Sequence, residues 1–124
     1  MTVLDSSAVL AYLNAESGHE RVVGHLEDGV VSSVNWTEIC QKVAEYTGST
    51  RIADGLLALG LTVMPFSRAD AVRAARLYPH TRSAGLSLGD RACIAVAIGL
   101  DRPVVTADRV WRELFPQLEV EVIR

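Results

Sequence analysis

The sequence predicts an α/β domain in which helices cover both faces of a mostly parallel sheet of about five strands. Short apolar runs rich in valine alternate with amphipathic helical segments almost throughout the 124 residues. Alternation of this kind favours a three-layer α/β/α arrangement around a parallel sheet. No repeat, low-complexity tract or linker interrupts it, and a chain of this length is typical of one domain. We therefore predict a single domain spanning residues 1–124.

The predicted strands are short apolar runs that lie between the helical segments. Pro65 favours an edge position for the third run, because proline donates no hydrogen bond to a neighbouring strand. The last run alternates polar and apolar residues, which predicts a closing strand with one buried face. The predicted strands cover residues 2–5, 30–33, 61–66, 103–105 and 119–123.

The predicted helices are bounded mostly by glycine or proline. The segment 36–47 is the clearest, because its apolar residues recur at the spacing of one helix face. Pro79 is predicted to end one helix and to open a loop at 80–86, and Gly99 is predicted to end the next. The predicted helices cover residues 6–15, 19–28, 36–47, 50–59, 68–78, 88–98 and 109–115.

Composition and charge argue against several classes of protein. The residues are 49% hydrophobic and the formal net charge is −3, which argues against a protein that holds nucleic acid by bulk charge. The start lacks the basic region of a signal peptide, and no apolar run approaches the roughly 20 residues that span a membrane. Cys40 and Cys93 have no C-x-x-C spacing and are interpreted as buried hydrophobic residues of a cytoplasmic protein.

Four acidic residues share one position relative to the predicted strands. Asp5, Glu38, Asp90 and Asp108 each follow an apolar run or lie in the first turn of the helix after it. In a parallel sheet, ligands bind beyond the carboxyl ends of the strands. Two charges about 5 Å apart repel by roughly 3 kcal/mol at an effective dielectric of about 20, and a cation offsets that repulsion. An all-carboxylate pocket suits Mg²⁺ or Mn²⁺, which activate water for attack on phosphorus.

Each of these acids also has a structural explanation when taken alone. Ser67 and Asp70 repeat the same helix-capping spacing after the run 61–66, so the metal-site hypothesis depends on the coincidence of several acids. The open alternatives are helix N-caps at Asp5 and Asp108, a capping box of Ser87 with Asp90, a capping-box spacing of Asn35 with Glu38, and an ion pair of Glu38 with Lys42.

The acids lie in segments that together form a recognisable set of motifs. The segments are Val3-Leu4-Asp5-Ser6-Ser7-Ala8, Asn35-Trp36-Thr37-Glu38, Gly85-Leu86-Ser87-Leu88-Gly89-Asp90-Arg91-Ala92-Cys93 and Thr106-Ala107-Asp108-Arg109. They resemble the motifs of PIN-domain ribonucleases, and most closely those of the VapC-type toxins of bacterial toxin–antitoxin pairs. The resemblance covers the whole chain, in order and with suitable spacing.

This resemblance implies a fold and a set of site residues. The strands before Asp5 and Asp108 are expected near the middle of the sheet, and the strand before Asp70 at an edge, away from the site. One or two Mg²⁺ or Mn²⁺ ions are implied. The implied ligands are Asp5, Glu38, Asp90 and Asp108. Thr106 and Ser6 are implied as supporting residues, and Thr106 would hold the last acid or metal-bound water. Many relatives carry a further acid a few positions after the last one, and Glu113 is the one candidate for it here.

The resemblance also implies partners. Family members cut single-stranded or looped RNA, such as tRNA or rRNA, usually as homodimers. A cognate VapB-type antitoxin forms a heteromeric complex with the toxin and blocks the site. Arg82, in the predicted loop before Asp90, is a candidate contact for substrate or antitoxin, whereas Arg73 and Arg76 are interpreted as a solvated helix face. Trp36 is interpreted as core rather than as a platform for bases.

The leading hypothesis is therefore a metal-dependent endoribonuclease toxin. Water deprotonated by the ion would attack the phosphodiester in line and leave a 5′-phosphate and a 3′-hydroxyl. A receiver-like phospho-acceptor domain is an alternative of similar length, but it needs a lysine at a strand end, and the only lysine, Lys42, falls inside a predicted helix. A PIN-like module that binds RNA without cleaving it is the third possibility.

Overall fold

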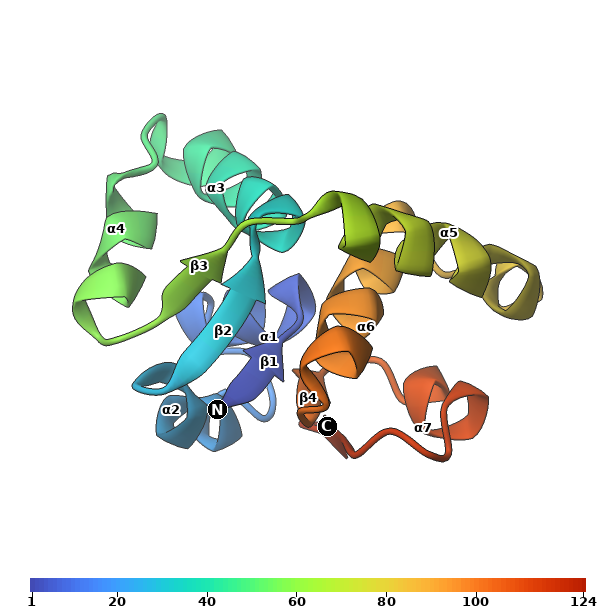
Figure 1. Cartoon of the computed structure of the whole chain (residues 1–124). Helices are drawn as coiled ribbons and strands as arrows, with labels where there is room; N and C mark the ends of the chain where they lie inside the picture. The colour runs from blue at the N-terminus through green and yellow to red at the C-terminus, as the bar shows by residue number, and fades with distance from the viewer.

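The computed structural model describes all 124 residues and contains one five-stranded parallel sheet (Figure 1). The strand order is β3-β2-β1-β4-β5, and every neighbouring pair is parallel. The predicted parallel α/β architecture is thus confirmed, with β1 and β4 side by side at the centre and β3, which precedes Pro65, at an edge. The strands are β1 (Thr2–Leu4), β2 (Gly29–Ser32), β3 (Thr62–Met64), β4 (Val104–Thr106) and β5 (Val120–Val122).

Helices cover both faces of this sheet. On β1 and β4, Leu4 and Val105 pack with α1 to α4, whereas Val3 and Val104 pack with α6 and α7. Successive side chains of a strand point to opposite faces, so these strands are buried on both sides. Figure 1 shows α5, α6 and α7 together on one side of the molecule. The helices are α1 (Ser6–Leu13), α2 (Glu20–Leu26), α3 (Ser33–Thr47), α4 (Arg51–Ala58), α5 (Arg68–Thr81), α6 (Leu88–Leu100) and α7 (Val110–Leu114), with a 3₁₀ turn η1 (Arg82–Ala84).

The prediction that Pro79 ends a helix and opens a loop at 80–86 was wrong. Helix α5 continues through Pro79 to Thr81, and η1 follows directly. Proline already has a helical φ, and it removes only one donor, here in an exposed last turn. Thr81 completes that turn, because its hydroxyl donates to the carbonyl of Leu77 at 3.0 Å. Only Gly85, Leu86 and Ser87 separate η1 from α6, which carries Asp90.

The predicted end of the next helix at Gly99 was also wrong. Helix α6 continues to Leu100, and Asp101 provides the left-handed residue that ends it, with φ of 53°. Aspartate adopts this conformation more readily than most residues. No helix of the structure is both long enough and apolar enough to span a membrane.

Gly18 and Gly24 form a matched pair for testing the fold. Gly18 has φ of +88°, and a Cβ there would lie 2.7 Å from the carbonyl carbon of Ile123, whereas a Cβ at Gly24, inside α2, would meet open space. We expect Gly18→Ala to lower the free energy of unfolding by about 1–3 kcal/mol. Gly24→Ala should raise it by about 0.5–1 kcal/mol. Urea unfolding measures both, and shifts of the same sign would contradict this account.

Candidate metal centre

Three of the four predicted acids follow adjacent strands of the sheet, and the fourth begins a helix beside them. Asp5 follows β1, Asp108 lies two residues after β4, and Glu38 lies in the second turn of α3, directly after β2. Asp90 lies in the first turn of α6. Their charges interact, since Asp90 and Glu38 help to raise the pKa of Asp5, and Asp108 and Glu38 help to raise that of Asp90. The structure therefore places the four acids close enough for their charges to interact.

Asp5 is the most buried of the four, with 2% of its surface exposed. Its Oδ2 accepts hydrogen bonds from Ser7 Oγ at 2.6 Å and from Thr106 Oγ1 at 2.9 Å. Its Oδ1 is buried without any partner. Asp5 stands at the N-cap position of α1, as the alternative predicted, but its side chain makes no capping bond, so capping does not account for this carboxylate.

The pKa of Asp5 reflects that environment. Burial raises it from 3.8 to about 7, and the nearby charges of Asp90 and Glu38 add to the effect, while the hydroxyls of Ser7 and Thr106 lower it. Removal from water disfavours the charged form of a carboxyl. A carboxylate buried in this way becomes fully charged at neutral pH only if positive charge is placed beside it.

Glu38 is held in place from two helices. Its Oε1 accepts from Ser6 Oγ at 2.7 Å and from Asn35 Nδ2 at 3.0 Å. Both structural explanations of Glu38 were wrong. The N-cap of α3 is Ser32 rather than Asn35, and Lys42 pairs with Glu45 at 3.5 Å.

Asn35 joins the parts of the site and was missed as a functional residue. It is fully buried, and its Nδ2 also donates to the carbonyl of Gly89 at 3.0 Å. A Cβ at Gly89 would lie 2.6 Å from the carboxyl carbon of Glu38, so a larger residue at this position would displace the Glu38 carboxylate. One sequence signal was present, because Asn35 shares the helix face of Ile39 and Val43, where a buried polar residue requires partners.

Thr106 and Ser7 connect the ends of β1 and β4. Thr106 Oγ1, which is buried, donates to Asp5 and accepts from the backbone N–H of Asp108 at 3.1 Å. Ser7 Oγ donates to Asp5 and accepts from the N–H of Ala107 at 3.0 Å. Thr106 thus contacts both the first and the last acid. Ser7 was missed, although it stands two residues after Asp5, within reach of a local side-chain bond.

Asp90 and Asp108 also make local bonds to their own helices. The predicted capping box is present: Asp90 Oδ2 accepts from the N–H of Ser87 at 2.8 Å, and Ser87 Oγ accepts from the N–H of Asp90 at 3.1 Å. Partial burial is the main reason that the pKa of Asp90 is raised. Asp108 Oδ1 accepts from the N–H of Val110 at 3.1 Å. Capping and a role in the site are therefore compatible.

One feature separates these four acids from Asp70. Each of the four makes its protein hydrogen bonds through a single oxygen, so that one oxygen per carboxylate stays free of protein donors. Asp70 uses both, since its Oδ2 accepts from Ser67 and its Oδ1 binds Arg73 at 3.0 Å. The free oxygens are Asp5 Oδ1, Glu38 Oε2, Asp90 Oδ1 and Asp108 Oδ2.

This donor set fits a hard divalent cation. Four carboxylate oxygens without protein donors, one of them buried and unpartnered, match the oxygen ligands that Mg²⁺ and Mn²⁺ prefer. As the side chains stand, no three His, Cys, Asp or Glu residues are gathered into a group that holds an ion.

The remaining predicted residues lie outside this centre. Arg82 is exposed at the start of η1, and Glu113 is exposed on α7 without a hydrogen bond to any of the four acids. Trp36 is partly buried and packs against the core, as interpreted from the sequence. A small groove of about 230 Å³ between α1 and α3 opens beside Ser6 and Glu38. The largest groove of the molecule lies on α5 and includes none of the four acids.

Comparison with known families excludes one of the remaining alternatives. The model of the PIN domain matches residues 2–114. The chain belongs to the PIN-domain family. The resemblance inferred from the motifs is thereby confirmed, and the receiver-like alternative was wrong. PIN domains are generally nucleases.

Solved structures share this fold along their whole length. A chain in a toxin–antitoxin complex from Klebsiella pneumoniae is similar with a TM-score of 0.79 and 15% identity, covering 100% of this chain and 98% of the other. DNA-bound VapBC from Salmonella typhimurium gives 0.76 and 17%, covering 99% and 98%. VapBC2 from Rickettsia felis, bound to a fragment of its promoter, gives 0.69 and 17%, covering 99% and 98%. Among curated protein sequences, none matches this chain.

Asp5→Asn is expected to stabilise the metal-free protein at neutral pH. Because the folded pKa of Asp5, about 7, lies above its usual value of 3.8, the native state keeps a proton that the unfolded chain loses. The wild type therefore loses stability as pH rises between these two values, by on the order of 4 kcal/mol. Asparagine carries no such proton and escapes this loss.

Urea unfolding in EDTA at about pH 4 and about pH 8 measures the difference in the free energy of unfolding between Asp5→Asn and the parent protein. It should be near zero at the lower pH and several kcal/mol in favour of Asp5→Asn at the higher pH. The raised pKa of Asp90 affects both proteins and cancels. The same pH dependence in both would contradict the assignment.

Proposed function

We propose that this protein is a metal-dependent endoribonuclease of the VapC type, the toxin of a toxin–antitoxin module. One observation carries the proposal: four carboxylates lie near the carboxyl ends of the strands, each with an oxygen that no protein donor satisfies. Repulsion among them and the burial of Asp5 both favour a cation at this place. Asp5, Glu38, Asp90 and Asp108 would hold Mg²⁺ or Mn²⁺.

The chain's own residues prepare this centre for chemistry on a phosphodiester. Ser7 and Thr106 hold the buried carboxylate of Asp5, while Ser6 and Asn35 hold that of Glu38. When bound, a divalent ion lowers the pKa of coordinated water and neutralises the charge that develops on the phosphate oxygens. Thr106 ties the end of β4 to Asp5 through hydrogen bonds to the Asp5 carboxylate and to the backbone of Asp108.

The attacking group in this proposal is water rather than a side chain. The hydroxyls of Ser6 and Ser7 are committed to carboxylates. Cys93 lies close enough for the charges of Asp5, Asp90 and Glu38 to affect it, but it is fully buried, and burial raises the pKa of its thiol well above the usual range. Attack by water would leave a 5′-phosphate and a 3′-hydroxyl.

The proposed partners follow from the same family. The similar structures include a toxin–antitoxin complex and VapBC complexes, which supports a cognate VapB-type antitoxin as partner, in a heteromeric complex built on a homodimer in the cytoplasm. RNA with a single-stranded or looped segment is the proposed substrate. Arg82, exposed just before the segment that leads to Asp90, is proposed to contact the substrate or the antitoxin.

Asp90→Asn tests this function with Asp70→Asn as its matched control. Both aspartates form the same capping box with a serine three residues earlier, and asparagine keeps an oxygen for the capping bond. Only Asp90 belongs to the proposed centre. We expect Asp90→Asn to lower the rate of RNA cleavage in Mg²⁺ by at least about 100-fold, the scale of losing one electrostatic contact to the reaction. Asp70→Asn should cleave at nearly the parent rate.

The measurement is cleavage of total cellular RNA by each purified protein, with the ends of the products mapped. EDTA should abolish cleavage by the parent protein. If Asp90→Asn cut RNA as fast as the parent, the assignment of the site would be wrong. RNA binding without any cleavage by the parent protein would favour the non-cleaving PIN module.

A further inference from the structure

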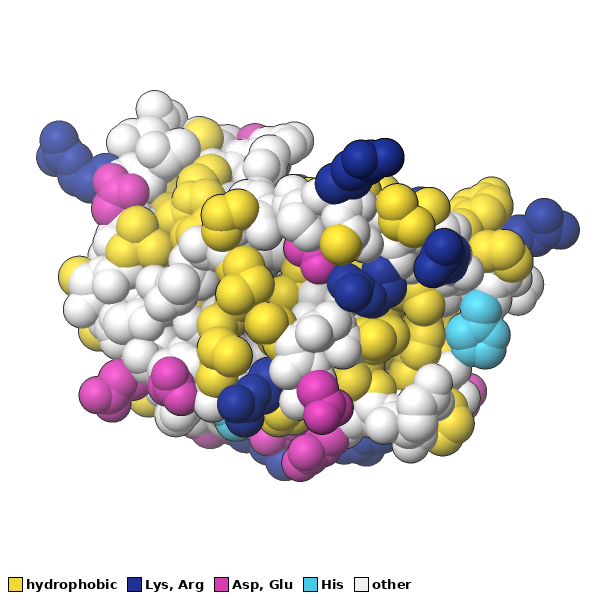
Figure 2. All heavy atoms as spheres, in the orientation of Figure 1, with side chains coloured by type: hydrophobic (Ala, Val, Ile, Leu, Met, Phe, Trp, Pro, Cys, Tyr) yellow, Lys and Arg dark blue, Asp and Glu magenta, His cyan; other side chains and the backbone are white.

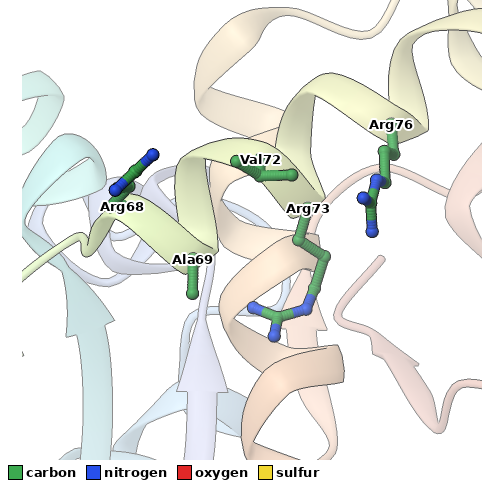
Figure 3. Close-up of a pocket in the computed structure, with 5 residues that line it drawn as sticks. All are labelled: Arg68, Ala69, Val72, Arg73 and Arg76. Carbon is green, nitrogen blue, oxygen red and sulfur yellow. The ribbon is translucent and has the colours of Figure 1, made fainter.

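The largest groove of the molecule lies along α5, outside the acidic centre. It is open, has a volume of about 560 Å³, and is lined by residues of α5 alone (Figure 3). Figure 3 shows the guanidinium groups of Arg68, Arg73 and Arg76 spread along the helix, with Val72 and Ala69 between them. This surface, the α5 arginine groove, has no part in the chemistry proposed above.

Charge is distributed unevenly between this region and the rest of the chain. Residues 68–91 contain five of the twelve Lys and Arg residues but only two of the fifteen acids. The segment therefore carries a net charge of +3, while the remainder of a chain with net charge −3 carries −6. Figure 2 shows basic side chains gathered on this face of the molecule. Such asymmetry favours an anionic ligand on this face.

Two of the three arginines are free to bind such a ligand. Arg68 and Arg76 are exposed and form no ion pair with any acid of the chain. Arg73 is fixed by Asp70 at 3.0 Å and lies over Gly99, where a Cβ would be 3.0 Å from its guanidinium carbon. From Arg68 to Arg76 the helix rises by about 12 Å, so the groove offers an extended row of charge rather than a single point.

The start of α5 is tied to the helix that carries Glu38. The N–H of Phe66, just before α5, donates to Ser33 Oγ at 3.0 Å, which ties the start of α5 to the first turn of α3. Glu38 lies in the next turn of α3. Figure 1 shows the chain between β3 and α5 passing beside the start of α3.

We propose that the α5 arginine groove binds the phosphates of the RNA strand beyond the bond that is cut. Arginine suits phosphate because its planar fork donates two hydrogen bonds at once, and contacts of this kind supply affinity without reading sequence. A second copy of the chain is disfavoured as the occupant, because a two-fold contact through this face would bring the same arginines together. The proposal rests on the proposed ribonuclease function.

The variant Arg68→Gln/Arg76→Gln tests this proposal, because it removes the two arginines of the groove that form no ion pair. Its control, Arg51→Gln/Arg102→Gln, removes two exposed arginines from elsewhere on the surface. Fluorescence anisotropy in EDTA measures binding of mixed-sequence single-stranded RNAs of about 16 and about 4 nucleotides. We expect the groove variant to bind the longer RNA about 10-fold more weakly than the parent protein. The slope of log K against log salt concentration should become less steep by about 1.4, the value for two phosphate contacts. Binding of the shorter RNA, and its cleavage in Mg²⁺, should be unchanged.

The outcomes are separable from those of the proposed function. If the parent protein cleaved no RNA, the ribonuclease function would fail, while the anisotropy data would still show whether the groove holds RNA. If the groove variant and its control bound the longer RNA equally well, the groove proposal would be overturned. It would also be overturned if the groove variant changed only the oligomeric state in analytical ultracentrifugation, because the groove would then be a protein interface.

Discussion

The carboxylate of Asp5 is the constraint on which the rest of this site depends. It is buried at the centre of the sheet, with one oxygen held by two hydroxyls and the other without a partner. An arrangement of this kind reduces stability as long as no positive charge is present, because the charged form has lost its water and gained other carboxylates as neighbours. A fold that retains it does so at the expense of stability, and a cation is the simplest means of offsetting that loss.

The surrounding structure can be understood as support for this one group. Strands β1 and β4 are neighbours at the middle of the sheet, so Thr106 can bridge Asp5 and the backbone of Asp108. Asn35 binds both Glu38 and the carbonyl of Gly89, which fixes α3 against the start of α6 and thereby places Asp90. The contacts that position the acids are thus mostly between elements that are distant in sequence. Substitutions at Ser7, Asn35 or Gly89 should disturb the centre although none of them carries charge.

Much of the architecture could be predicted from the sequence, because the spacing of apolar residues and the positions of glycine and proline are local properties of the chain. Pro65 marked the edge strand, and the apolar runs marked a sheet buried on both faces. Pro79 was misleading, since its effect depends on whether the helix around it is otherwise supported. The two capping boxes of Ser67 with Asp70 and Ser87 with Asp90 look alike in sequence. What separates them is tertiary: Arg73 occupies the second oxygen of Asp70, while nothing occupies that of Asp90. The role of Asn35 was hidden for the same reason.

The most direct test of this account is the pKa of Asp5 itself, measured by ¹³C NMR of its carboxyl group across a pH titration with and without Mg²⁺. Without metal, we predict a value near the one that burial produces, about 7. With Mg²⁺ it should fall below the usual value of 3.8 for aspartate, because the ion stabilises the charged form. The Asp70 carboxyl serves as an internal reference that should not respond to the metal. A pKa of Asp5 that Mg²⁺ leaves unchanged would contradict the metal centre.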